Sequence, residues 1–175
     1  PSPPWLRDKL EAIGLRSIST LVDITNLFTI DLGRPLHVFD AARLKGDTLT
    51  VCRGGNETIR TLDGRDYIVT SEDCVIADAA GVQSIAGIMG GEATEVTDAT
   101  TEVFIECALF DPIRIALTGR RLGIGSDARY RFERGVDQAM PVMALEAATR
   151  LILDLCGGQA SEVVSAGAPP AWGRT

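Results

Sequence analysis

The stretch CVIADAAGVQSIAGI, residues 74–88, holds two short apolar runs that meet at Gly81. Two strand-length runs joined at a glycine predict a β-hairpin. A second hairpin is expected over 59–69, because Asp63-Gly64 is a preferred two-residue turn. Two further strands are expected on either side of these hairpins, at 48–52 (TLTVC) and 103–110 (VFIECALF). Strands therefore predominate in the middle of the chain.

Outside the strand-rich region, apolar residues recur at helical spacing. Four helices are expected, over 2–14 with Ser2 as N-cap, 21–32, 111–122 and 137–156. The run EVVSA at 162–166 is expected to add a last strand. This pattern predicts an α+β fold. We expect a mixed, mostly antiparallel sheet core, with helices packed at the N- and C-terminal ends in a layered sandwich.

The chain length of 175 residues suits one hydrophobic core. Proline and glycine near both ends are typical of linkers. We therefore expect a domain over 5–166 between linkers at 1–4 and 167–175, cut from a longer polypeptide. No run approaches the roughly 20 apolar residues that a membrane span needs, and no export signal is recognised at the start.

The four cysteines stand far apart and form no CxxC pair. Reduced thiols in a cytoplasmic protein are the expectation from this spacing. A single histidine with scattered cysteines also argues against a zinc site, so no metal is expected.

The net charge of -7 argues against a general nucleic-acid surface, which must neutralise phosphates. The segment 114–134 is different, because its six arginines outnumber Asp127 and Glu133 and leave it basic. A basic patch on an acidic domain is able to receive a short end of RNA. A solvated helix face, balanced by acids elsewhere, would have the same composition, so charge alone leaves both interpretations open.

The sequence lacks the residues that several common enzyme mechanisms need. A serine or cysteine hydrolase needs a nucleophile beside a base, but there is one histidine and no GxSxG motif. The GxxxxGK[ST] loop is absent too. The run 123–128 fits GxGxxA, yet it follows a helix-like stretch rather than a strand, so a dinucleotide site is not indicated.

Two polar residues stand out. Glu106 lies in the most apolar strand expected for the chain, where a carboxylate is costly unless it is hydrogen-bonded or paired. An ion pair with an arginine from 114–134 would explain it structurally. His37 is expected in a loop between Pro35 and Phe39, where it either has a chemical role or fixes the loop by bonding the backbone.

Eight blocks of sequence then occur in one order: VDITN (22–26), PLHVFD (35–40), LDG (62–64), VIAD (75–78), AGIMGG (86–91), IECA (105–108), SDA (126–128) and RFERGVD (131–137). Together they resemble the editing domain of the bacterial phenylalanyl-tRNA synthetase beta subunit over about residues 2–158. The resemblance implies a synthetase of two alpha and two beta chains, with tRNA(Phe) as partner. The alpha chain would activate phenylalanine with ATP and Mg²⁺, whereas this domain would need no cofactor.

The resemblance also implies the residues of an editing site. Catalytic roles fall on His37 and Asn26, which would lie near the ester bond and the attacking water. Substrate-binding roles fall on Glu106, Gly90, Ser126, Ala128, Pro35 and Gly91, and RNA-binding roles on Arg129, Arg131 and Arg134. Three positions depart from the family pattern: Ser126 stands for threonine, Arg129 for a small polar residue and Cys107 for serine.

In such a site Glu106 would recognise the hydroxyl of a tyrosine wrongly attached to tRNA(Phe). Water would then attack the aminoacyl ester, and backbone N–H groups near Gly90 and Gly91 would steady the oxyanion. Two alternatives remain: a non-catalytic RNA-docking or structural module of the same synthetase, and a free-standing hydrolase or small-molecule binder on this fold.

Overall fold

The computed structural model describes residues 1–168. Its helices are α1 (Pro4–Glu11), α2 (Thr20–Asp31), α3 (Pro112–Leu122), α4 (Asp127–Phe132) and α5 (Pro141–Cys156), with short 3-10 turns η1 (Ala41–Arg43) and η2 (Glu92–Thr94). Its strands are β1 (His37–Asp40), β2 (Thr50–Arg53), β3 (Thr58–Arg60), β4 (Asp66–Ile68), β5 (Cys74–Asp78), β6 (Gly81–Ile85), β7 (Met89–Gly90) and β8 (Val103–Glu106).

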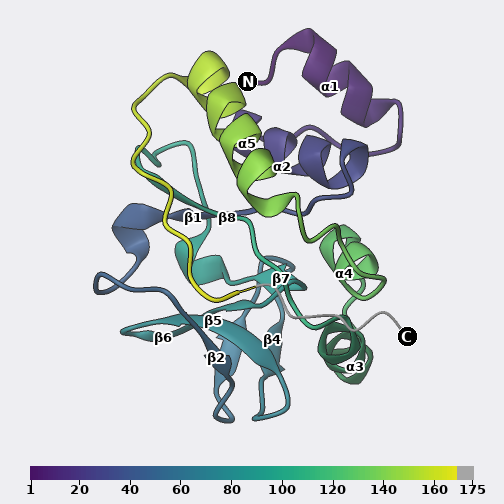
Figure 1. Ribbon diagram of the computed structural model, residues 1–175, viewed down its shortest axis with the longest axis vertical. Helices are drawn as coiled ribbons and strands as arrows, with labels where there is room; N and C mark the ends of the chain where they lie inside the picture. The colour runs from purple at the N-terminus through teal and green to yellow at the C-terminus, as the bar shows by residue number, and fades with distance from the viewer. Residues whose placement is uncertain (169–175) are drawn as a thin grey trace.

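The strands form three antiparallel groups. The largest is a four-stranded sheet in the order β2-β5-β6-β7, and the hairpin β3-β4 lies near it. A separate two-stranded ribbon pairs β1 with β8, segments that are far apart in the sequence. In Figure 1 this ribbon runs between the helices α1, α2 and α5 on one side and the four-stranded sheet on the other. The predicted α+β class is confirmed.

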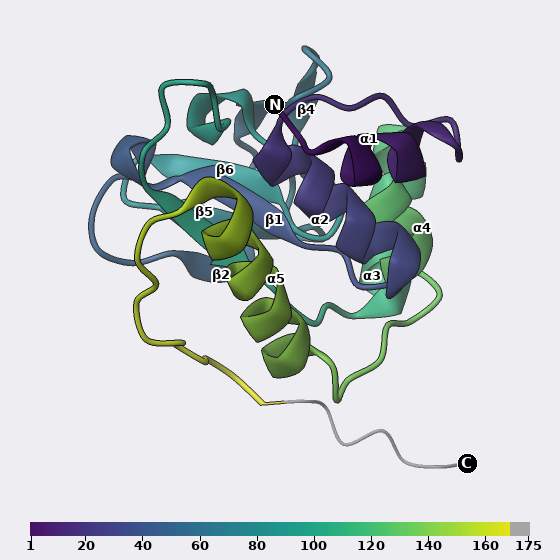
Figure 2. The same cartoon turned by 90° about the horizontal axis from the view of Figure 1, so that it is seen from above.

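Helices cover the ribbon and one end of the sheet. Viewed from above, α2 and α5 lie over β1, while α3 and α4 stand together at one end of the molecule (Figure 2). Asp111 begins α3 by accepting hydrogen bonds from the N–H groups of Ile113 and Arg114. Gly123 ends the helix with a φ of 68°, a left-handed conformation that glycine adopts without strain.

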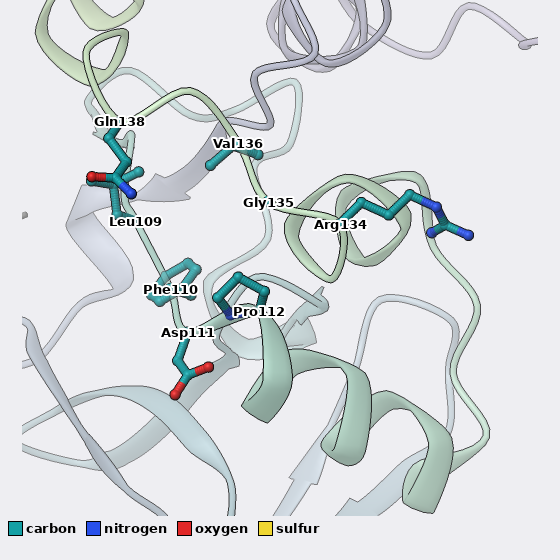
Figure 3. A pocket seen from close by; sticks show the side chains of 8 residues that line it. All are labelled: Leu109, Phe110, Asp111, Pro112, Arg134, Gly135, Val136 and Gln138. Atoms are coloured by element: carbon teal, nitrogen blue, oxygen red, sulfur yellow. The ribbon is translucent and has the colours of Figure 1, made fainter. Parts of the chain in front are cut away.

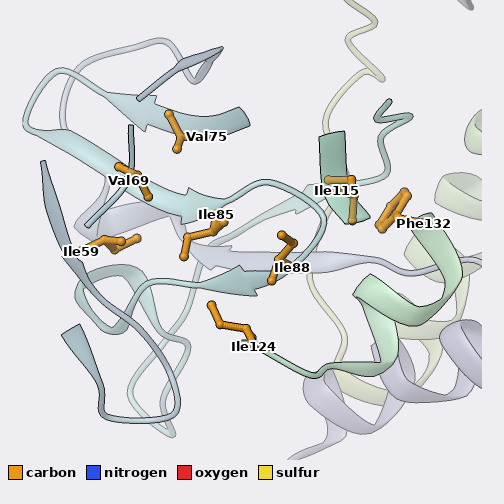
Figure 4. Close-up of a cluster of buried hydrophobic side chains, with 8 residues drawn as sticks. All are labelled: Ile59, Val69, Val75, Ile85, Ile88, Ile115, Ile124 and Phe132. Carbon is orange, nitrogen blue, oxygen red and sulfur yellow. The ribbon is translucent and has the colours of Figure 1, made fainter. Parts of the chain in front are cut away.

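Two main hydrophobic clusters lie on opposite sides of the β1-β8 ribbon. The helical cluster consists of Leu6, Leu10, Ile24, Phe28, Ala144, Ala148 and Ile152. The sheet cluster joins the strands to α3 and α4 and consists of Ile59, Val69, Val75, Ile85, Ile88, Ile115, Ile124 and Phe132 (Figure 4). Neighbouring residues of the ribbon face opposite sides. Ile105 packs against the helical cluster, whereas Phe39, on the other face, packs in a small third cluster with Ile76 and Ala86.

Both predicted hairpins are confirmed, with Gly64 and Gly81 at positive φ in their turns. The predicted cap of the first helix is wrong. Pro3 precedes α1, and the Ser2 hydroxyl instead donates to the buried carboxylate of Asp23. A buried carboxylate needs several hydrogen-bond donors, and that of Asp23 accepts from the hydroxyls of Ser2 and Ser17 and from the N–H of Ile18.

Three other expectations are corrected. The strand expected over 103–110 ends at Glu106, because only 103–106 have partners in β1. No strand forms at 162–166; this segment is exposed and lies against no strand edge in the described part of the chain. Helix α5 begins at Pro141 rather than near Asp137, and α4 was not predicted. Within the predicted linker at 167–175, residues 169–175 lie outside the described residues.

Candidate functional site

The site centres on one cross-strand pair of the β1-β8 ribbon. His37 is the register partner of Glu106, so both side chains project from the same face of the ribbon. The predicted loop position of His37 is therefore wrong, since the residue begins strand β1. The two side chains line a cavity of about 60 Å³, whose walls are Pro35, Leu36, His37, Ser84, Gly87, Ile88, Met89, Gly90, Glu106, Ala128 and Phe132.

The Glu106 carboxyl has no ion pair among the described residues. The alternative of an ion pair with an arginine from 114–134 is thus wrong for the described structure. Burial raises the pKa of Glu106 to about 7, because a charge is poorly solvated there, and the positive charge of Arg34 partly opposes this rise. Near neutral pH the group is therefore divided between carboxylate and acid.

The His37 imidazole is held in a tight pocket. Burial lowers its pKa to about 4, so the ring is neutral at physiological pH. It packs edge-on against Phe39, with ring centroids 4.4 Å apart. On its other side lies Gly90, where an added Cβ would stand 2.7 Å from the His37 Nε2 atom and even closer to Cε1. Glycine is therefore required at 90 if the ring is to keep this place.

Helix α4 forms the opposite wall through Ala128 and Phe132. The Ser126 hydroxyl fixes this helix in two ways: it accepts from the N–H of Arg129 at 3.1 Å and donates to the carbonyl of Ile88 at 2.7 Å. The second bond ties the start of α4 to the loop between β6 and β7. Ser126 thus positions the wall, although it is not itself among the lining residues.

Two other predicted site residues are not brought into the cavity. Asn26 lies on α2 and is absent from the lining. The N–H of Gly91 donates to the carbonyl of Gln83 at 2.8 Å, and an added Cβ would meet that oxygen at 2.7 Å. This N–H is engaged within the sheet, and the expected oxyanion role of Gly91 stays a prediction.

The three predicted RNA-binding arginines make internal bonds. Arg129 donates to the carbonyl of Ile124 at 2.6 Å and to Glu133 at 3.0 Å, and its side chain crosses α3 where Gly119 leaves room. Arg131 pairs with Asp127 at 3.0 Å. Arg134 pairs with Glu133 and lies 3.6 Å from the centroid of the exposed Tyr130 ring. Their RNA contact stays a prediction.

Sequence reasoning missed part of the lining, notably Met89 and Phe132, and it also missed Arg34 behind it. Phe132 and Met89 lie in the quoted blocks RFERGVD and AGIMGG, but as apolar residues they carried no signal that separates a cavity wall from a core. Arg34 immediately precedes PLHVFD, and its complete burial is visible only in three dimensions.

A larger cavity, of about 460 Å³, lies beside the start of α3 and is lined by Leu109, Phe110, Asp111, Pro112, Arg134, Gly135, Val136 and Gln138 (Figure 3). Its charged groups are engaged elsewhere. Asp111 caps α3, and Arg134 bonds Glu133 and covers Tyr130. Despite its size, it does not combine a free acid with a histidine, so the smaller cavity is the candidate site.

Within residues 1–168, no cluster of three or more His, Cys, Asp or Glu side chains is placed to hold a metal ion. None of the helices described over the same range has the length and hydropathy required to cross a membrane.

Known proteins match the chain over nearly its whole length. The B3/4 domain family matches residues 1–157. The phenylalanine–tRNA ligase beta subunit of Gluconobacter oxydans is 61% identical over 175 residues, which are 100% of this chain and 21% of that protein. The same subunit of Paramagnetospirillum magneticum is 59% identical over 174 residues, 99% of this chain and 22% of that protein.

The beta subunit of Rhodospirillum rubrum is likewise 60% identical over 176 residues, 99% of this chain and 22% of that protein. This chain thus spans about a fifth of the length of these curated relatives. The predicted resemblance is confirmed by these matches, and the chain belongs to the B3/4 domain family.

Proposed function

We propose that this domain edits errors of a phenylalanine–tRNA ligase by hydrolysing the ester of tyrosine wrongly attached to tRNA(Phe). The observation that carries the proposal is the Glu106 carboxyl, which has no ion pair with any described residue and lies at a cavity directly across the ribbon from His37. A half-buried acid that has no structural partner among the described residues suits recognition of a hydrogen-bond donor on a ligand.

Selectivity follows from the cost of leaving this acid unpaired. The phenol of tyrosine donates a charge-assisted hydrogen bond to the Glu106 carboxylate. Phenylalanine has no such donor and would bury the carboxylate alone. Leaving a buried polar group unsatisfied costs about 1–3 kcal/mol, which is roughly a 5- to 150-fold preference for tyrosine. The site thereby inverts the preference of a synthetic site shaped for phenylalanine.

The hydrolytic step needs little more than a positioned water, because an aminoacyl ester is already activated. The neutral His37 ring accepts a hydrogen bond from that water and orients it toward the ester carbon. A pKa of about 4 makes the imidazole a weak base, which favours the orienting role over full proton removal.

The aromatic ring enters with movement of the lining. The cavity of about 60 Å³ has room for about four waters, less than a phenol ring requires. Met89 is the lining residue with the most flexible side chain, and its rotation enlarges the space. Gly90 adds no further space, because the His37 ring already occupies the place where a side chain at position 90 would begin.

The proposal implies partners that act outside the chain. They are the acceptor end of tRNA(Phe) and the alpha subunit of a synthetase in the cytoplasm, where ATP and Mg²⁺ would serve the separate synthetic site. Asn26 remains a proposed catalytic group near the ester, and Arg129, Arg131 and Arg134 remain proposed contacts to the tRNA end, although none of them lines the cavity.

The test is release of tyrosine from preformed Tyr-tRNA(Phe) by the full synthetase. We expect Glu106→Ala to reduce the rate about 5- to 150-fold, from the loss of the phenol's partner. Glu102→Ala is the matched control, because Glu102 is an exposed glutamate just before β8. Full rate and selectivity in the Glu106 variant would leave a non-catalytic docking or structural module as the better account.

A further inference from the structure

Arg34 is a buried cation that has no carboxylate partner in the described structure. Only 1% of its surface is exposed. Its Nη2 donates to the carbonyl of Ala108, whereas Nε and Nη1 have no hydrogen-bond partner. Arginine is almost never fully buried unless it is paired, and an uncompensated buried charge costs several kcal/mol. A packing role alone does not account for this cost, because an uncharged side chain would avoid it.

The local chain path places this cation directly behind the candidate site. Gly33 turns the chain at the end of α2, and the N–H of Arg34 donates to the carbonyl of Phe28 at 3.1 Å. The guanidinium carbon lies 5.7 Å from the centroid of Phe132, whose ring forms part of the cavity wall. Ala108, which accepts from Nη2, lies two residues after Glu106.

Arg34 is also the one charged group that acts on the Glu106 carboxyl. Its positive charge lowers the pKa of Glu106 against the larger effect of burial. It also opposes the rise that burial causes in the pKa of the neighbouring Cys107 thiol, there by its charge and by a side-chain hydrogen bond. The other titratable groups near Glu106 are uncharged at neutral pH: His37 across the ribbon, Cys107 beside it and Cys74 on β5. From β6-β7 and α4, the cavity walls contribute no charged side chain.

We propose that Arg34 is a positioning residue of this site, a fixed cation behind the cavity that favours the ionised form of Glu106, the form that accepts the hydrogen bond of a phenol most strongly. The inference rests on the editing function proposed above. An ionised carboxylate binds the phenol by a charge-assisted bond, whereas the protonated acid offers only a neutral one. Arg34 would thus act on selectivity without touching the tyrosine.

The experiment measures single-turnover release of tyrosine from Tyr-tRNA(Phe) by the full synthetase between about pH 5.5 and 8.5. Each rate is divided by that of Glu106→Gln at the same pH, which removes the hydroxide dependence of ester hydrolysis itself. We expect Arg34→Met to move the midpoint of this ratio to higher pH. A displacement of about one pH unit corresponds to a roughly fivefold lower ratio at pH 7. At the alkaline end the difference from the unaltered enzyme should disappear.

Three further variants separate the charge effect from damage to the fold. Arg34→Lys keeps the charge and should restore the midpoint. Arg34→Met should cause no additional loss in a Glu106→Gln background, because its target is then absent. Arg121→Met is the matched control: it deprives the buried Asp73 of its cation on the far side of α3, yet it should leave the midpoint unchanged. If Arg34→Met does not accumulate as folded enzyme, Arg34→Gln serves as the neutral variant.

An unchanged midpoint and unchanged tyrosine selectivity in folded Arg34→Met would overturn this inference alone, provided that Glu106→Gln is impaired. If Glu106→Gln releases tyrosine at the normal rate, an ionised carboxylate is not needed and the role of Arg34 fails, whereas the editing proposal stands or falls separately with Glu106→Ala.

Discussion

Gly90→Ala tests how closely the site is built around the His37 ring. The new Cβ would stand 2.7 Å from Nε2 of His37 and 3.2 Å from Cδ1 of Leu62. Ordinary contacts between such atoms are about 3.5–4.0 Å, so the ring must move by about 1 Å. Overpacking of this kind costs about 1–3 kcal/mol of stability, and a misplacement of 1 Å in a positioning group can cost about 100-fold in rate.

The assay pairs tyrosine release from Tyr-tRNA(Phe) with thermal unfolding of the same enzyme. We expect a loss of release of about 100-fold, larger than the loss of stability would explain, because the methyl group displaces the water-orienting ring. Gly125→Ala is the matched control, since an added Cβ there meets no atom within 4 Å. A folded Gly90→Ala enzyme that keeps half or more of the normal rate would refute the role given to His37.

Two other predictions concern stability. For Glu106, a folded-state pKa of about 7 against the ordinary 4.5 means that the folded protein holds a proton which the unfolded chain releases. Stability is therefore lost as the pH rises from about 4.5 through 7, and Glu106→Gln should raise the free energy of unfolding at pH 8 by up to about 3 kcal/mol in urea melts; an equal stability of both proteins at pH 8 would contradict the burial of this acid. Ser126→Ala should cost about 1 kcal/mol in the same melts, because α4 loses its cap and its bond to Ile88; Ser126→Thr, which keeps the hydroxyl, should restore it.

The parts of the fold that local chemistry determines were predictable, and the parts that depend on distant partners were not. The turn at Gly64 carries its own backbone requirement, so the 59–69 hairpin could be predicted. The strand position of His37 was not predictable, because only pairing with β8 makes residues 37–40 a strand. At 162–166 the error has the opposite sense. The β-branched residues predict a strand, but no described strand pairs with this segment.

The same division holds for the site. Glu106 could be found because a carboxylate in an apolar run is anomalous in any sequence. Arg34 could not, since one arginine among many gives no sign of its burial. Nothing in the sequence indicates that the Gly91 N–H is occupied, because its bond to the Gln83 carbonyl depends on the path of β6.

The alternation of β8 side chains between the helical cluster and the cavity has a consequence for insertions and deletions. Ile105 and Glu106 are adjacent, yet one side chain packs into the helical cluster and the other opens onto the cavity. Loss or gain of a single residue within β8 would exchange them, burying a carboxylate among the helices and pointing an isoleucine at the ligand. Such length changes damage folding and selectivity together. Within β8, substitution therefore changes one side chain at a time, whereas a change of length changes both faces of the ribbon.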